Sequence, residues 1–463
     1  MDFPYHLCYN GLKLCKKDAT MRNLTQDNIS KVILQFAFPV FLGQIIQLFY
    51  SITDTWIIGK ILGTSALAAV GSVCVISDMI VGFLIGLTNG FSVIAARYYG
   101  AANTKELNKT FASSLLFGTL AAVFLTLFCI VFLPQLMHLM NIAPEHITEG
   151  TTYIKIILLG IVAPMFYNVL ASILRATGDT KAALLFLLIS TVLNIILNIV
   201  LVGIVRMGIA GASIGTVISQ LFSAVLCFIY IYRRYPMLHL TKESFSFSTK
   251  LAKQLCLSGL SMGLMNSLVA MGTVVLQSSI NTFSANIIVA HYAARKLTSI
   301  FMTPFIVLGM TMTSYCGQNY GAKHFDRIRL GVKKSIFYSW IWCAFVVVMS
   351  YTIVPSLIKT ITSTNVDEVI QMSTLYLRVD TLLYFVAAVI SISRNALQGI
   401  GDHITPIISS FIELVGKYLT VIFLAPKLGY MGIILSEPIV WVLMVIPLLI
   451  KCKKNVVFRS GVY

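Results

Sequence analysis

The sequence predicts an all-α integral membrane protein with twelve transmembrane helices, arranged as two parallel-repeat six-helix bundles. Three observations predict this class. The 463-residue chain is 57% hydrophobic and only 11% charged, whereas soluble domains carry about 25% charged residues. Apolar runs of helical length recur along nearly the whole chain, and short sequences of the first half return in the second half in the same order.

Each apolar run is long enough to cross a hydrocarbon core of about 30 Å, and continuous rather than alternating runs favour helices. We expect transmembrane helices at residues 32–58, 65–96, 110–136, 149–175, 181–204, 210–233, 254–281, 286–316, 334–358, 370–398, 404–425 and 431–450. The chain then divides into a cytoplasmic N-terminal segment (1–31), a first bundle (32–233) and a cytoplasmic linker (234–253). A second bundle (254–450) and a cytoplasmic tail (451–463) follow.

The positions of the basic residues predict the orientation of the chain. The formal net charge of +17 would also suit a nucleic-acid-binding protein, but the charges lie in the connections between apolar runs. If the N-terminus is cytoplasmic, 24 of the 34 Lys and Arg residues fall in cytoplasmic segments, Arg97 and Arg175 included, and four fall outside. This asymmetry is the positive-inside rule. We therefore expect a multi-pass protein of the cell (inner) membrane with both termini in the cytoplasm and no nucleic-acid partner.

The repeat has a constant offset. Tyr99-Gly100-Ala101 returns as Tyr320-Gly321-Ala322, 221 residues later, and Gly178-Asp179 returns as Gly401-Asp402, 223 residues later. Six helices is an even number, so the two halves face the same way. Parallel repeats of this kind occur in secondary transporters, with the substrate path between the halves, although channels also duplicate.

Placing a polar residue inside a membrane costs free energy, so polar residues within transmembrane helices often have a function. Three helices of the first half carry polar residues three or four positions apart, which places them on one helix face. They are Gln44, Gln47, Ser51 and Asp54 in the first helix, Thr191, Asn194 and Asn198 in the fifth, and Ser213, Thr216, Gln220 and Ser223 in the sixth. These stripes predict a water-accessible cavity. The alternative is that the hydroxyl and amide groups hold the helices together by hydrogen bonds.

Carboxylates inside the predicted helices are the strongest candidates for function. Asp54 has no basic residue within one helical turn, so it requires a cation, a proton or water. Glu413 precedes Lys417 by four residues, and a structural ion pair is an equal alternative for it. Asp380 is either functional or hydrated near the outer surface. Asp78, Glu437, His291 and Arg295 are weaker candidates. The predicted substrate-cavity residues are Gln44, Gln47, Ser51, Thr191, Gln220, Asp380 and Glu413.

Missing motifs exclude several classes of protein. The sequence has no GxxxxGK[ST] loop, no HExxH and no GxSxG, so we expect neither ATP hydrolysis nor another enzymatic activity. It has no selectivity filter such as TVGYG. We expect no cofactor, and no metal beyond a sodium ion at Asp54.

Seven segments together resemble the multidrug and toxic compound extrusion (MATE) family, over nearly the whole chain from Lys31. They are Pro39 to Gly59, Ala66 to Gly71, Tyr99 to Ala101, Leu174 to Asp179, Leu193 to Asn198, Gly317 to Ala322 and Gln398 to Asp402. The resemblance implies a V-shaped pair of bundles that exports organic cations or drugs, by alternating access, in exchange for protons or sodium. It places the ion or proton site of relatives on Asp54, Asn194 and Thr216.

The sequence departs from the family in two places. Many relatives have an aspartate where this chain has Asn198, which removes one negative charge from the first-half site and leaves the coupling ion open between proton and sodium. One branch has a carboxylate in the seventh helix, where this chain offers Asn266, Thr273 and Gln277. We expect a monomer that binds small organic cations. The alternatives are a lipid-linked precursor flippase of the same superfamily and an uncoupled channel.

Overall fold

The computed structural model describes residues 23–139, 144–246, 248–362 and 365–459, which are almost entirely helical. The first half comprises α1 (Ile29–Leu62), α2 (Thr64–Gly100), α3 (Thr104–Val131), α4 (Leu133–Leu139), α5 (Pro144–Leu159), α6 (Val162–Ala176), α7 (Thr180–Asn198), the π-helix η1 (Ile199–Ile204) and α8 (Gly208–Arg234). Short 3₁₀ turns η2 (Pro236–Leu238) and η3 (Lys242–Phe245) follow in the linker.

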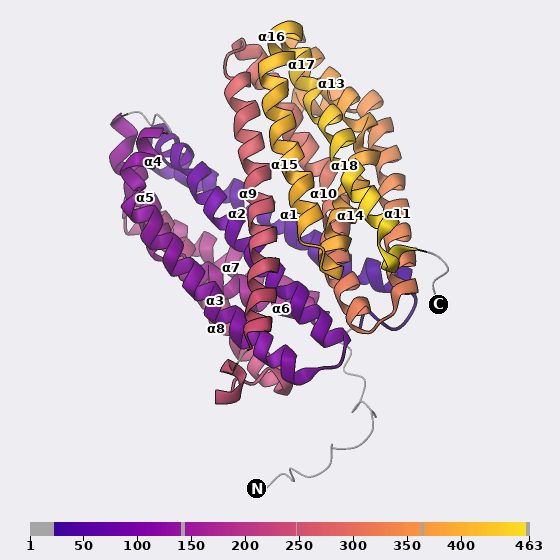
Figure 1. Cartoon of the computed structure of the whole chain (residues 1–463). Helices are drawn as coiled ribbons and strands as arrows, with labels where there is room; N and C mark the ends of the chain where they lie inside the picture. Colours follow the sequence, from indigo (N-terminus) through magenta and orange to yellow (C-terminus); the bar gives the residue numbers. More distant parts are fainter. Residues whose placement is uncertain (1–22, 140–143, 247, 363–364, 460–463) are drawn as a thin grey trace.

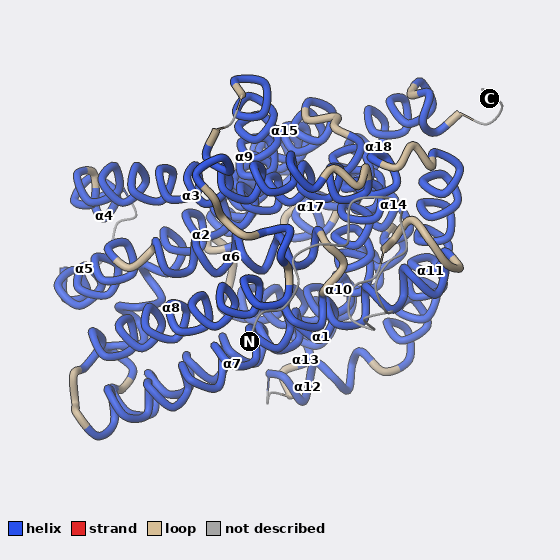
Figure 2. The backbone as a smooth tube through the Cα atoms, turned by 90° about the horizontal axis from the view of Figure 1, so that it is seen from below, coloured by secondary structure: helices blue, strands red, loops and turns tan. Residues whose placement is uncertain are grey.

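The second half repeats this order. It comprises α9 (Thr249–Ile280), α10 (Ala285–Gly321), α11 (Phe325–Thr352), α12 (Val354–Thr362), α13 (Asp367–Leu382), α14 (Tyr384–Ile400), α15 (Ile404–Leu419), the π-helix η4 (Thr420–Leu424), α16 (Ala425–Leu428), α17 (Tyr430–Ile434), α18 (Ser436–Lys454) and the turn η5 (Val456–Phe458). The two halves form two bundles that meet at the end nearest the N-terminus and diverge toward the other end (Figure 1). Seen from below, the two bundles lie side by side (Figure 2).

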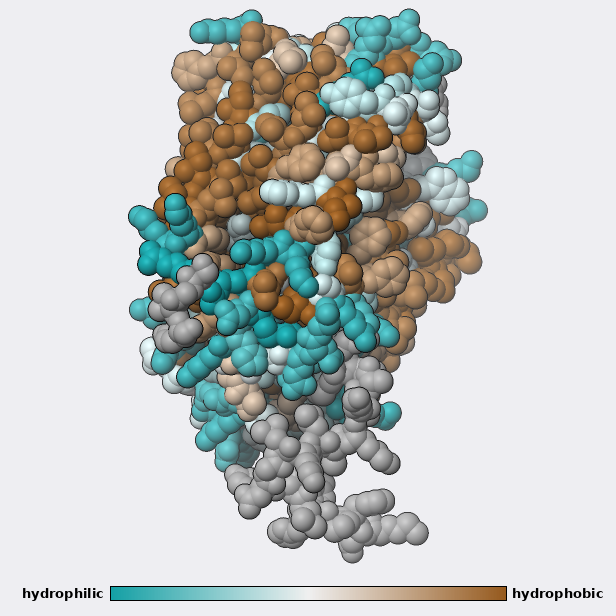
Figure 3. Space-filling model, turned by 90° about the vertical axis from the view of Figure 1, so that its right-hand side faces the viewer, coloured by the Kyte–Doolittle hydropathy of each residue, from teal (hydrophilic) through white to brown (hydrophobic). Residues whose placement is uncertain are grey.

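The prediction of twelve spans in two repeated bundles is confirmed. Within the described residues, ten helices are long and apolar enough to cross a membrane, and two bent pairs bring the number to twelve if each pair is one span. The fourth predicted span is bent by 48° between α5 and α6, and the tenth by 54° between α13 and α14. Pro164, which has no N–H for the carbonyl of Gly160, explains the first bend. A broad apolar belt covers the second bundle, with polar residues above and below it (Figure 3).

The repeat extends to local irregularities. The π-helices η1 and η4 interrupt the fifth and eleventh spans at equivalent positions. Single π-helical turns inside α-helices are often found at functional sites. In this chain η1 begins immediately after Asn198, one of the predicted site residues, so the irregular backbone lies next to the polar stripe of the fifth span.

The two bundles exchange the first parts of their first helices. Residues of α1 up to Val40, Phe36 included, belong to the hydrophobic core of the second bundle. Leu251 and Leu255 at the start of α9 belong to the core of the first bundle. The region where the bundles meet is therefore held by packing in both directions, and α1 joins the second bundle near its start and the first bundle near its end.

Backbone contact closes this end of the molecule. A Cβ at Gly100 in α2 would collide with the carbonyl of Gln318 in α10, and a Cβ at Gly321 would collide with the carbonyl of Arg97. The Gln318 side chain donates to the carbonyl of Ala176 at 2.7 Å and accepts from the N–H of Leu24 at 2.9 Å. These contacts explain why the Tyr-Gly-Ala sequence recurs in both halves, because only glycine permits so close an approach.

Candidate functional site

The polar residues predicted in the first half form one connected hydrogen-bond network. Asn198 Nδ2 donates to Asp54 Oδ1 at 2.6 Å and to Asn194 Oδ1 at 3.1 Å. Asn194 Nδ2 donates to Thr216 Oγ1 at 3.2 Å, and the Tyr50 hydroxyl lies 3.3 Å from the same oxygen. The network joins α1, α7 and α8, so all four residues predicted for ion or proton coupling lie together.

The sequence positions these groups through helix periodicity and one glycine. Asn194 and Asn198 are four residues apart and therefore lie on one face of α7; both are buried. Gly215 of α8 lies against the Asn198 amide, and a Cβ at that position would be 2.5 Å from Asn198 Oδ1. The absence of a side chain at Gly215 lets the amide reach Asp54.

The Asp54 network contains a carboxylate and neutral polar groups but no basic side chain among the described residues. Asp54 is half-buried, and in the described part of the chain no basic side chain lies within ion-pair distance of it. Asn198 Oδ1 is buried, and no hydrogen-bond donor among the described residues contacts it. A half-buried carboxylate beside an unused amide oxygen can accept a proton or an oxygen-seeking cation. No cluster of three or more His, Cys, Asp or Glu residues that could hold a metal ion occurs in the described ranges.

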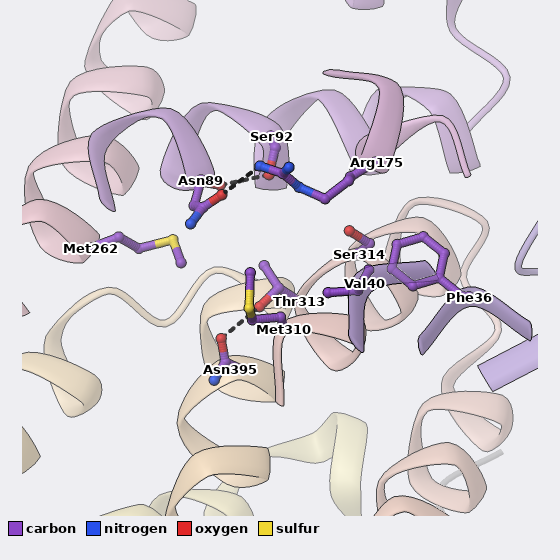
Figure 4. Close-up of a pocket in the computed structure, with 10 residues that line it drawn as sticks. All are labelled: Phe36, Val40, Asn89, Ser92, Arg175, Met262, Met310, Thr313, Ser314 and Asn395. Atoms are coloured by element: carbon purple, nitrogen blue, oxygen red, sulfur yellow. Dashed lines mark hydrogen bonds between the residues drawn. The ribbon is translucent and has the colours of Figure 1, made fainter. Parts of the chain in front are cut away.

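Two adjoining pockets lie where the bundles meet and share Arg175. The first, the inter-bundle pocket (Figure 4), is lined by Phe36, Val40, Asn89, Ser92, Arg175, Met262, Met310, Thr313, Ser314 and Asn395. The second, the helix-1 pocket, is lined by residues that include Gln44, Gln47, Asn168, Thr180 and Arg175. Gln44 and Gln47, which we expect to line the substrate cavity, line the helix-1 pocket. Neither lining contains a carboxylate among the described residues.

The other predicted cavity residues of the first half lie elsewhere. Ser51 is exposed. Thr191 is buried and donates to the carbonyl of Leu187 one turn earlier at 2.9 Å. Gln220 is half-buried, and its Oε1 is buried without a partner. None of the three lines the inter-bundle pocket or the helix-1 pocket.

The second bundle contains a chain of five charges of alternating sign. Arg295 contacts Glu437 at 2.7 Å, Glu437 contacts Lys417 at 3.5 Å, Lys417 contacts Glu413 at 2.9 Å, and Glu413 contacts Arg394 at 3.7 Å. The ion pair between Glu413 and Lys417, one of the two alternatives for Glu413, is present in the structure. His291, whose ring packs edge-on against Tyr376, lines a pocket with Arg295 and Glu437.

Asp380 is fully buried in the second bundle, so the expectation of a hydrated position near the outer surface is wrong. Thr298 Oγ1 donates to Asp380 Oδ2 at 3.3 Å. Neither Asp380 nor Glu413 lines the inter-bundle pocket or the helix-1 pocket. The bend between α13 and α14 begins three residues after Asp380.

Sequence reasoning missed two residues that face the polar regions. Tyr50 is four residues before Asp54, on the same face of α1, and its hydroxyl lies 3.3 Å from Thr216 Oγ1. Arg175 was assigned to the cytoplasmic charges because it ends a predicted helix, whereas its guanidinium reaches into both pockets. The Leu-Arg-Ala-Thr-Gly-Asp segment that carries Arg175 indicated the family, but it did not indicate that Arg175 lines a pocket.

The fold and these sites define a multi-spanning membrane protein with two repeated bundles, a polar network in the first bundle and small pockets where the bundles meet. The family model MatE matches the chain twice, at residues 39–200 and 261–422. Both matches are offset by 222 residues, in agreement with the repeat. The chain therefore belongs to the MATE family of membrane transporters, which is not a family of enzymes.

Individual proteins agree with this assignment. The chain is 24% identical over 414 residues to "Probable multidrug resistance protein YoeA" of Bacillus subtilis, covering 87% of this chain and 89% of that protein. It is 23% identical over 426 residues to "FAD transporter" of Shewanella oneidensis, covering 90% and 92%. The fold is similar to "Crystal structure of MATE in the bent conformation", with a TM-score of 0.84 and 21% identity over 92% of this chain and 96% of that one.

Proposed function

We propose that this chain is a secondary active antiporter that exports organic cations or drugs in exchange for protons or sodium, by alternating access. The observation that carries the proposal is the Asp54 network. A carboxylate within a membrane helix, bonded to neutral amides and lacking a basic partner, can change its charge state without leaving a buried cation unpaired.

The steps follow from this geometry. In the outward-facing state Asp54 takes up a proton or a sodium ion, which weakens the charge-assisted hydrogen bond from Asn198. Contacts between α1 and α7 change, and the bound cation is released outward. In the inward-facing state Asp54 gives up its ion, and its negative charge favours entry of the next cationic substrate. The membrane potential contributes about 2.3 kcal/mol per charge per 100 mV.

The arrangement of the molecule in the membrane is part of the proposal. We place the end where the bundles meet, together with both termini and the linker at 234–253, in the cytoplasm of a cell membrane. Lys323, Arg327 and Lys334 lie in this region, which suits the positive-inside rule. Each bundle, 32–233 and 254–450, acts as a rocking unit of a monomer.

Transport in proteoliposomes tests the proposal. Proton and sodium gradients are imposed separately, and uptake of a fluorescent cation such as ethidium is followed. We expect one of the two gradients to drive transport, and Asp54→Asn to lower the gradient-driven rate at least tenfold because the amide cannot change its charge. Asp367→Asn, at an exposed carboxylate in the first turn of α13, is the matched control. Cation movement that ignores both gradients, or an Asp54→Asn rate within twofold of the parent, would sink the antiport mechanism.

A further inference from the structure

A third pocket lies at the junction of the bundles, and the proposed mechanism does not use it. This junction pocket has a volume of about 520 Å³, within the range of about 300–1,000 Å³ that is usual for small-molecule sites. Its polar and aromatic lining residues are Arg97, Tyr98, Gln254, Tyr320, Lys323 and Phe325. They come from α2, α9, α10 and α11, so the pocket contacts both bundles at the end where they meet (Figure 1).

The charge of the junction pocket is positive. Its lining contains two basic side chains and, among the described residues, no carboxylate. Lys323 is exposed and makes no hydrogen bond or ion pair with the described part of the chain. Two nearby carboxylates are paired on their own helices, Glu106 with Lys109 at 3.4 Å and Asp326 with Arg329 at 2.9 Å. The described side chains therefore leave the positive charge of the pocket unbalanced.

Arg97, the other basic residue of the pocket, bridges the bundles. Its Nε donates to the carbonyl of Gly399 at 3.0 Å, and its Nη2 donates to the carbonyl of Gln398 at 3.4 Å, both in α14. These bonds use two of the five N–H donors of a guanidinium, and no described carboxylate is within ion-pair distance. The guanidinium carbon lies 5.3 Å from the centroid of the Tyr320 ring. Arg97 is thus held in a fixed position and keeps donors for a ligand.

The internal repeat contains an equivalent bridge in the second half. Arg97 corresponds to Gln318 at the repeat offset of 221, and Ala176 corresponds to Gly399 at the offset of 223. Arg97 donates to the carbonyl of Gly399 as Gln318 donates to the carbonyl of Ala176. The first bridge carries a positive charge, and the second bridge is neutral.

The chain itself fills the place beside Gln318. Leu24 is buried there, its N–H donates to Gln318 Oε1 at 2.9 Å, and its carbonyl accepts from Asn319 Nδ2 at 3.2 Å. Tyr98 is the equivalent of Asn319, and together with Arg97 it lines the junction pocket. The place that a backbone segment occupies in the second half is therefore a basic pocket in the first half.

We propose that the junction pocket binds a phosphate group, carried by an anionic lipid headgroup or by a small soluble phosphate ester. Guanidinium and ammonium groups are the usual partners of phosphate oxygens. The Tyr98 hydroxyl donates to Gln254 Oε1 at 3.4 Å, which leaves the amide N–H groups of Gln254 to donate to the ligand. A phosphate that contacts both Arg97 and Lys323 bridges the bundles and stabilises the conformation in which this end is closed. The site shares no residue with the Asp54 network and goes beyond the proposed antiport.

Thermal unfolding of the purified protein in a nonionic detergent tests the inference. Dioctanoyl phosphatidylglycerol, dioctanoyl phosphatidylcholine and glycerol phosphate are titrated separately at constant ionic strength, and the melting temperature is followed. We expect a saturable rise with at least one of the two anionic probes and none with the zwitterionic phosphatidylcholine. A response to phosphatidylglycerol alone assigns the site to a lipid headgroup, and a response to glycerol phosphate assigns it to a soluble ester.

Substitutions locate the response. Lys323→Gln and Arg97→Gln should each raise the half-saturating concentration about tenfold, as the loss of one charge-assisted hydrogen bond predicts. Lys105→Gln is the matched control, because Lys105 is an exposed lysine in the first turn of α3 that does not line the pocket. It should behave as the parent does. Lys323→Gln decides the result if Arg97→Gln fails to fold, since Lys323 has no described contact to lose.

Two results would overturn the inference. One is a parent protein whose melting temperature responds to neither anionic probe. The other is a half-saturating concentration that is the same in Lys323→Gln as in Lys105→Gln. Because the assay requires no transport, a failure of the antiport proposal would leave its result standing.

Discussion

Gly215→Ala perturbs the Asp54 network without touching any of its polar groups. The new Cβ would lie 2.5 Å from Asn198 Oδ1, whereas ordinary contacts begin at 3.4 Å. The amide must therefore move by about 0.9 Å, the difference between the two values. The Asn198–Asp54 hydrogen bond is 2.6 Å long. A movement of that size along the bond would lengthen it to about 3.5 Å, beyond the range of a good hydrogen bond.

The loss should appear in coupling rather than in folding. A hydrogen bond to a charged group is worth about 1.5–3 kcal/mol, so we expect gradient-driven export to fall about tenfold or more in proteoliposomes. The melting temperature should change little, because the clash is with the end of a side chain. Gly71→Ala is the matched control, since Gly71 is a helical glycine with open space around its Cβ position.

A double-mutant cycle decides whether the effect passes through Asn198. If it does, Gly215→Ala combined with Asn198→Ala should export no more slowly than Asn198→Ala alone, because residues in one network are not additive. The reasoning is refuted if Gly215→Ala exports within twofold of the parent, or if its defect simply adds to that of Asn198→Ala.

Three further predictions follow from the same structure. Asn198→Asp should raise the dependence of export on sodium, because it places a second carboxylate beside Asp54; unchanged ion dependence would argue against an ion at this network. Single cysteines at Ser246 and Thr282 should report topology, with only the second labelled from outside; strong external labelling at position 246 would contradict a cytoplasmic linker. Glu437→Gln should destabilise the protein by about 3 kcal/mol, because it removes the ion-pair partner of Arg295 and one of the two partners of the buried Lys417; a melting temperature equal to the parent's would show that these pairs contribute nothing.

The sequence predicted the parts of this molecule that follow from periodicity. Gln44, Gln47 and Asp54 lie on one helix face because their spacing is three or four residues, and Glu413 meets Lys417 for the same reason. Contacts between helices could not be worked out in this way, because spacing along one helix says nothing about the helix it packs against. The network of Asp54 with Asn198 was expected only through the resemblance to a family.

The second bundle shows most clearly that contacts between helices cannot be predicted from spacing along one helix. Arg295, Lys417 and Glu437 come from three predicted helices, and nothing in the sequence indicated that these three side chains meet. They meet because α10, α15 and α18 pack together, and an ion pair between residues 142 positions apart leaves no local pattern. The position of Arg175 was predicted wrongly for a different reason. The positive-inside rule applies to every arginine at a helix end, and it cannot tell which arginine side chain turns toward a pocket.

If transport is coupled to an ion, as we propose, the difference between the two bundles favours the first bundle as the place where the ion binds. In the second bundle, protonation of Glu437 would remove the ion-pair partner of the half-buried Arg295, and protonation of Glu413 would remove that of Arg394, which is unfavourable. In the first bundle, neutralising Asp54 weakens one hydrogen bond from a neutral amide and leaves no cation behind. The charge change that costs least is therefore the one at Asp54. The second bundle has a chain of ion pairs, whereas the first bundle has a carboxylate without a basic partner among the described residues. In the proposed mechanism the first bundle therefore responds to the ion, and the second bundle stays rigid.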